Sequence, residues 1–96
     1  MTTEELYQNL IEKGYNKLGN RYSKILLLDT YILIEVKNNI IKILASSSMG
    51  LTMEYMVVLS SVRYYTTIER IIDTMMRRIK HTEANIEFIF KEDGKE

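Results

Sequence analysis

Cysteine, proline and tryptophan are absent from this 96-residue chain, and histidine occurs once. Without cysteine the chain can form no disulfide, no thiolate zinc site and no cysteine nucleophile. A serine triad would depend on His81, which has no nucleophile-elbow sequence near it. We interpret His81 as a solvated residue in the last turn of a long helix, where the helix dipole favours a cation. The sequence therefore predicts no catalytic residue and favours a protein that is not an enzyme.

Glycine is scarce, and the four glycines, at positions 14, 19, 50 and 94, are too far apart to form a phosphate-binding loop. Clustered metal ligands are lacking as well. Asp29, Glu35 and Glu54 could converge on one face of a sheet as oxygen ligands, but each is also explained as a solvated or cross-strand-paired charge. We therefore expect no cofactor and no metal.

Neither sign of charge is in excess, because 13 Lys and Arg balance 13 Asp and Glu. This balance excludes a protein that coats nucleic acid nonspecifically, since that task needs a surplus of cations. The longest apolar stretch is interrupted by Asp29 and Thr30, and the N-terminal residues are acidic where a signal peptide is basic. We expect a cytoplasmic protein with one α+β domain over residues 1–91 and a frayed polar tail over 92–96.

Residues with A/T-rich codons are abundant, whereas alanine is rare and proline is absent. Such a composition suits a low-GC bacterium, its phage or an archaeal virus. It suggests a viral or mobile-element factor, which would act in the cytoplasm of its host.

The first residues predict a short amphipathic helix. Thr2 and Glu5 have the spacing of a capping box, and apolar residues follow at helical intervals. Gly14 suits the left-handed residue that ends a helix. The helix therefore ends at Gly14 or continues to Leu18.

Residues 24–45 predict two strands of an antiparallel hairpin. Asn38 and Asn39 form a plausible two-residue turn, because asparagine tolerates a positive φ. Folding the chain there places Glu35 opposite Lys42 and β-branched residues opposite one another, as favourable cross-strand pairs require.

A third strand is predicted over residues 53–59, with its phase open because Val57 and Leu59 compete with Met56 and Val58 for the core side. From residue 66 the apolar residues recur every three or four positions, which predicts a long helix. Thr66 would cap its start.

A last short strand is suggested by Ile86, Phe88 and Phe90, which alternate with Glu87, Ile89 and Lys91, and a continued helix is the alternative. The predicted fold is α+β, with a small antiparallel sheet of three strands, or four, an N-terminal helix and a longer helix in the C-terminal half. The order is α-β-β-β-α(-β).

The hairpin register makes the sheet apolar on both faces, whereas a one-sided sheet alternates more cleanly. Two helices can cover one face. The core residues predicted for that face are Leu26, Leu28, Ile32, Ile34, Val36, Ile41, Ile43 and Ala45. The residues left on the other face form the candidate association surface: Ile25, Leu27, Tyr31, Leu33 and Leu44. Contiguous apolar patches of this kind mark partner surfaces, so we expect a homodimer unless a loop or the C-terminal segment folds over that face.

Charge is distributed unevenly along the neutral chain. Residues 60–82 carry five basic against two acidic side chains, and residues 83–96 carry two basic against five acidic. The candidate nucleic-acid contacts are Arg63, Tyr64, Tyr65, Arg70, Arg77 and Arg78. They could contact phosphates and stack on bases, although cations also favour a helix C-terminus and a tyrosine can close a core.

The sequence thus favours a small non-enzymatic binding module that acts through protein–protein association, with a second copy of itself and with an unknown protein partner. The alternative is a nucleic-acid-binding regulator that uses the arginines and tyrosines between residues 63 and 78. A small enzyme ranks third.

Overall fold

The computed structural model describes residues 1–26 and 29–93, with side chains up to Ile86. The elements are α1 (Thr3–Glu12), β1 (Asn16–Leu18), β2 (Arg21–Leu26), β3 (Thr30–Lys37), β4 (Ile40–Ser46), β5 (Thr52–Val58), the 3-10 helix η2 (Leu59–Ser61) and α2 (Tyr65–Asp93). The five strands form one antiparallel sheet in chain order, β1-β2-β3-β4-β5. The predicted α+β class is confirmed, with five strands rather than three or four.

Helix α1 begins and ends where its local sequence predicts. The backbone N–H of Glu5 donates to Oγ1 of Thr2, which is the N-cap. Leu6 and Leu10 are fully buried on one side of the helix. Gly14 follows with φ of 89°, a conformation that glycine adopts without strain, so the helix stops before it and does not reach Leu18.

The predicted hairpin is confirmed as strands β3 and β4. Glu35 lies opposite Lys42, and Ile34 lies opposite Ile43, as the register requires. Asn38 and Asn39 form the turn with φ of 52° and 62°. Two successive positive φ values give a turn whose twist matches that of the flanking strands.

The first strand of that prediction is wrong in its extent, because the run from residue 24 to residue 37 is two strands, β2 and β3. Asp29, between them, has φ of 60° and lies where the chain reverses. A continuous strand across this point would need an extended Asp29. The reversal lets β2 pair with β3 and allows β1 to add beyond it.

Strand β5 resolves the phase that the sequence left open. Met53 and Val57 lie half-buried against the core, whereas Glu54, Met56 and Val58 are exposed on the opposite face. Val57 therefore takes the core side.

Helix α2 overturns one expectation at each of its ends. It runs through Asp93, so the short strand suggested over residues 86–90 is helix. Neither glycine nor proline occurs between Gly50 and Gly94, which leaves the helix without a breaker. The helix begins at Tyr65, so Thr66 lies inside its first turn rather than at its cap. Residues 94–96 of the predicted tail lie outside the described residues.

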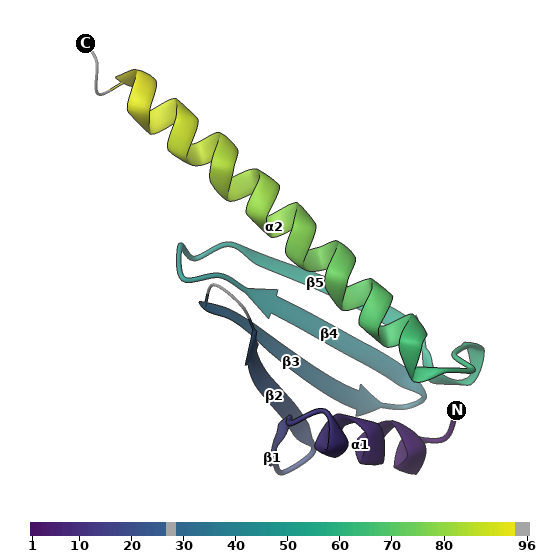
Figure 1. Ribbon diagram of the computed structural model, residues 1–96. Coiled ribbons are helices and arrows are strands. Elements are labelled where there is room, and N and C mark those ends of the chain that lie inside the picture. Colours follow the sequence, from purple (N-terminus) through teal and green to yellow (C-terminus); the bar gives the residue numbers. More distant parts are fainter. Residues whose placement is uncertain (27–28, 94–96) are drawn as a thin grey trace.

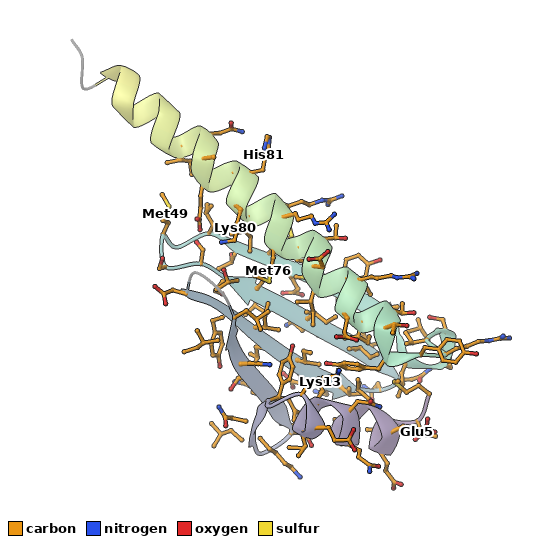
Figure 2. The ribbon with its side chains drawn as sticks, viewed as in Figure 1. Glu5, Lys13, Met49, Met76, Lys80 and His81 are labelled. Carbon is orange, nitrogen blue, oxygen red and sulfur yellow. The ribbon has the colours of Figure 1, made fainter. Side chains whose placement is uncertain are left out.

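His81 is therefore in the interior of α2 and not in its last turn. Figure 2 shows its side chain on the side of the helix that faces away from the sheet. The residue is exposed.

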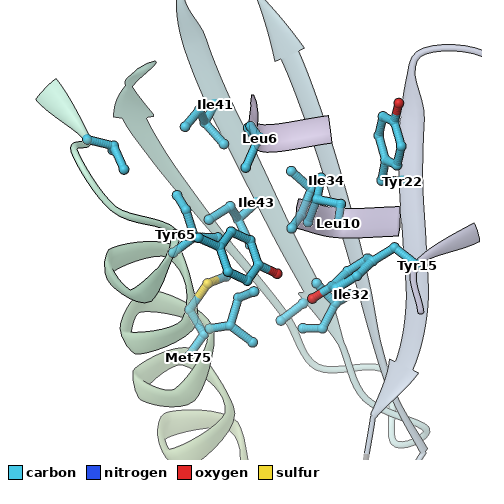
Figure 3. Close-up of a cluster of buried hydrophobic side chains, with 14 of the residues drawn as sticks. Leu6, Leu10, Tyr15, Tyr22, Ile32, Ile34, Ile41, Ile43, Tyr65 and Met75 are labelled. Atoms are coloured by element: carbon cyan, nitrogen blue, oxygen red, sulfur yellow. The ribbon is translucent and has the colours of Figure 1, made fainter. Parts of the chain in front are cut away.

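Both helices pack on one face of the sheet (Figure 1). The buried side chains form one cluster that joins α1, the inner face of the strands and α2 (Figure 3). It contains Ile32, Ile34, Ile41, Ile43 and Ala45, which were predicted for this face. Of the other predicted core residues, Leu26 and Val36 pack at its margin and Leu28 lies outside the described residues.

The long helix extends past the sheet. Its 29 residues span about 43 Å at 1.5 Å per residue, whereas the longest strand has 8 residues and spans roughly 26 Å. Figure 1 shows the C-terminal part of α2 projecting beyond the loop between β4 and β5. The molecule is accordingly elongated, 55 Å long and 20–24 Å across.

Candidate protein-binding surfaces

The outer face of the sheet, opposite both helices, carries four of the five residues of the predicted association surface. Ile25 is 69% exposed and Tyr31 is 39% exposed, whereas Leu33 and Leu44 are half-buried. Leu27, the fifth residue, lies outside the described residues. No described segment of the chain folds over this face, because both helices lie on the other side.

Charged residues border the apolar residues of this outer face. The Nε atom of Arg21 lies 3.5 Å from a carboxylate oxygen of Glu35, and Lys42 Nζ lies 3.7 Å from a carboxylate oxygen of Glu54. Glu35 therefore pairs with β2 and not with Lys42, although the two are register partners. Ile25 lies opposite Tyr31 and Leu33 lies opposite Leu44, so these four residues are neighbours on the face. The ion pairs border Leu33 and Leu44 on one side and limit the extent of the apolar surface.

The two edges of the sheet differ in length and in composition. β1 has 3 residues, all of them exposed, and one is a lysine. β5 has 7 residues, of which only Glu54 is charged. Tyr55, Met56 and Val58 on β5 are 47%, 61% and 42% exposed. Soluble proteins protect sheet edges with short strands, charges or proline, and β5 has few of these protections.

The hydrogen bonds at both ends of β5 show which of its backbone groups face the open edge. Leu59 N–H donates to the Asn39 carbonyl, and Ser47 N–H donates to the Leu51 carbonyl. Hydrogen-bonded and non-hydrogen-bonded pairs alternate along an antiparallel ladder, so the odd-numbered residues of β5 bond to β4. The N–H and C=O groups of Thr52, Glu54, Met56 and Val58 therefore point away from the sheet.

An open groove of about 520 Å³ lies between β5 and α2. Its apolar lining comes from Met53, Ile71 and Met75, and the partly exposed Tyr55 also lines it. Arg70 and Arg78 also line the groove, and neither forms an ion pair with any described residue.

The six candidate nucleic-acid contacts do not form one surface. Tyr65 is buried in the core, and Arg77 pairs with Asp73 at 2.8 Å one turn away on α2. Arg63 and Tyr64 are exposed in the turn that precedes α2. Of the six residues, only Arg70 and Arg78 line the same groove.

Tyr65 instead faces Tyr15 across the interior. The Tyr65 ring comes from the start of α2 and the Tyr15 ring from the residue before β1, with their hydroxyl groups toward each other (Figure 3). Burial raises the pKa of Tyr15 to about 12 and raises the pKa of Tyr65 as well. The pair is structural, because both side chains are less than 10% exposed.

Three carboxylates that could have formed a metal site are separated. Glu35 and Glu54 form ion pairs with different bases, and Asp29 is in the turn before β3. Within residues 1–26 and 29–93, no three potential ligands come together. In the same part of the chain, none of the helices is long and apolar enough to cross a membrane.

Comparison with known proteins adds no relative: no family model, curated protein or solved structure matches this chain.

The exposed edge at β5 is the feature that sequence reasoning missed. The residue types of positions 53–59 predict a strand, and its single charge could have indicated an unprotected one. The sequence does not show which strand is left at the edge of the sheet without a neighbour.

Proposed function

We propose that this protein is a small non-enzymatic binding module that acts through protein–protein association and forms a homodimer. The proposal rests on the unprotected edge at β5. This edge combines outward-pointing N–H and C=O groups, exposed apolar side chains and an adjacent groove. An exposed strand of this composition is a template for a further strand.

The outer face of the sheet is the second surface that could support association. Ile25 and Tyr31 offer apolar area, but the ion pairs around Leu33 and Leu44 would have to stay solvated or find partners in an interface. We therefore favour the β5 edge over the outer face.

Light scattering on a sizing column tests this function directly. We expect a species of twice the chain mass of 11.3 kDa, whose proportion rises with protein concentration. Tyr55→Lys should reduce the dimer, whereas Ile25→Lys, the matched change on the outer face, should leave it intact. A concentration-independent species of 11.3 kDa would refute self-association.

The composition extends the proposal to a viral or mobile-element factor that engages a host component in the cytoplasm. Affinity capture from candidate hosts tests this part. Recovery of the same host protein by the parent chain, and its loss with Tyr55→Lys, would support it. Recovery that is unchanged by the substitution would argue that the host protein binds elsewhere.

A nucleic-acid-binding regulator is the second candidate, because Arg70 and Arg78 line one groove with Tyr55. Phosphate contacts would make binding fall steeply with salt. We propose titrating labelled DNA and RNA at several ionic strengths with the parent chain, with Arg70→Gln, and with Lys17→Gln as a control outside the groove. A flat or absent response would remove this candidate.

A further inference from the structure

The β5 edge can accept a second β5 in a small number of registers. A two-fold axis that pairs the outward-facing, even-numbered residues with one another passes through a residue of β5. An axis at Met53 or Val57 would pair only three residues of each strand, which leaves Glu54, Tyr55 and Met56 as candidates. An axis at Glu54 would place two like charges directly opposite, which is unfavourable. An axis at Met56 would leave Thr52 opposite a residue beyond the end of the partner strand.

An axis at Tyr55 has neither disadvantage. It places Glu54 opposite Met56 of the partner and Thr52 opposite Val58, so all 7 residues of each strand are paired. The two Tyr55 side chains meet on the face that carries the helices, beside the groove.

We infer that two copies of this chain join their sheets through antiparallel pairing of β5, with the two-fold axis at Tyr55. This inference rests on the proposed function and specifies the surface and the register of the homodimer. It produces one continuous sheet from the two five-stranded sheets.

The position of α2 fits this arrangement. The helix packs over both β4 and β5 and runs antiparallel to β5 (Figure 1). Strands lie about 4.8 Å apart. Because α2 packs over both β4 and β5, each helix axis lies about one strand spacing from the two-fold axis, so the two α2 axes would be about 10 Å from each other. This is the distance at which helices pack. The partner helix would then lie along the groove, whose lining from α2 includes Ile71 and Thr74. Arg70 and Arg78 also line the groove, and because both are exposed their guanidinium groups would remain at its solvated rim.

The area requirement leads to the same conclusion. A stable interface buries roughly 800 Å² on each partner, which is more than the edge of one strand supplies. Pairing the helices along the groove adds the side chains of α2 to the interface, so the strand and the helix together make a surface of adequate size.

Charge along the chain also suits an antiparallel pair of helices. Residues 60–82 have a net charge of +3 and residues 83–96 have a net charge of −3. In the dimer, the projecting C-terminal part of one α2 would pass beside the turn that precedes the partner's α2. The helical residues 83–93 of one copy, of which four are acidic and one is basic, would thereby pass near the basic segment of the other, which includes the exposed Arg63.

The absence of cysteine makes the register testable by crosslinking, because a single introduced cysteine has no other thiol to react with. We propose four variants under mild oxidation: Tyr55→Cys, Glu54→Cys, Met56→Cys and Ile25→Cys. In the proposed register two copies of residue 55 form a non-hydrogen-bonded pair, with Cα atoms about 4.5 Å apart and within disulfide range. Circular dichroism would confirm that each variant keeps the fold of the parent chain.

We expect Tyr55→Cys to form a covalent dimer at least tenfold faster than the other three variants. Faster crosslinking of Glu54→Cys or Met56→Cys would overturn the register. Faster crosslinking of Ile25→Cys would place the interface on the outer face, so the dimer would stand and the β5 inference would fail. A chain that scatters as 11.3 kDa and crosslinks at none of these positions would refute both the inference and the proposed function.

Discussion

Replacing Met56 with proline should weaken the dimer while leaving the monomer folded. The Met56 N–H points away from β4, and a proline at an edge position removes no hydrogen bond from the protomer's own ladder. In the proposed dimer the same N–H donates to Glu54 of the partner. Because the interface is two-fold symmetric, Met56→Pro removes two donors from each dimer.

The size of the effect follows from those two hydrogen bonds. Each contributes about 1 kcal/mol net, so the dimer should lose about 2 kcal/mol of association free energy. This corresponds to a roughly thirtyfold rise in the dissociation constant. The loss increases further if the Glu54 carbonyls are buried without a donor.

Sedimentation equilibrium measures the dissociation constant directly, and urea unfolding of the dilute protein measures the stability of the monomer. Met56→Ala is the matched control, because it removes the same side chain but keeps the backbone N–H. We expect Met56→Ala to dimerise more tightly than Met56→Pro by about one order of magnitude or more. Equal dissociation constants for the two variants would show that this N–H is not at the interface.

Three further outcomes are expected. Ile68→Ala removes a fully buried side chain of α2 and should lower the free energy of unfolding, measured by urea titration, by roughly 2–5 kcal/mol. A loss below 1 kcal/mol would contradict this packing. The raised pKa of Tyr15, about 12 in the folded state against 10.0 unfolded, should leave stability intact below pH 10 and reduce it as pH rises toward 12. Tyr15→Phe should flatten that decline, and an unchanged pH profile would argue against the buried hydroxyl. Arg63→Glu should weaken dimerisation by about 1 kcal/mol, or roughly fivefold, with Lys17→Glu unchanged in sedimentation equilibrium; equal effects of the two would remove the charge argument.

Several parts of the fold follow from short-range features of the sequence. Helix α1 is bounded by the Thr2 cap and by Gly14, and the hairpin turn is set by the conformational tolerance of Asn38 and Asn39. Each depends on residues within a few positions of one another. Such signals are local, so they were readable before the structure.

Other parts could not be predicted because the local signals were ambiguous. The residues around Asp29 have strand propensity on both sides, so a turn there resembles an interruption in one strand. Residues 86–90 satisfy the period of a strand and are also free of helix breakers. Continuity with the preceding turns of α2 favours the helix, since extending a helix is easier than starting a new element.

The amino-acid sequence determined the α+β class, the hairpin register and the residues that face each side of β3 and β4, because alternation along a strand assigns faces without any knowledge of neighbours. The tertiary structure alone decided that both helices cover the same face and that β5 has an open edge. Strand order is a long-range property. The side chains of a strand show which of its faces points to the core. Its backbone N–H and C=O groups are chemically the same whether they pair with a neighbouring strand or with water, so the sequence does not show which strand lies at the edge.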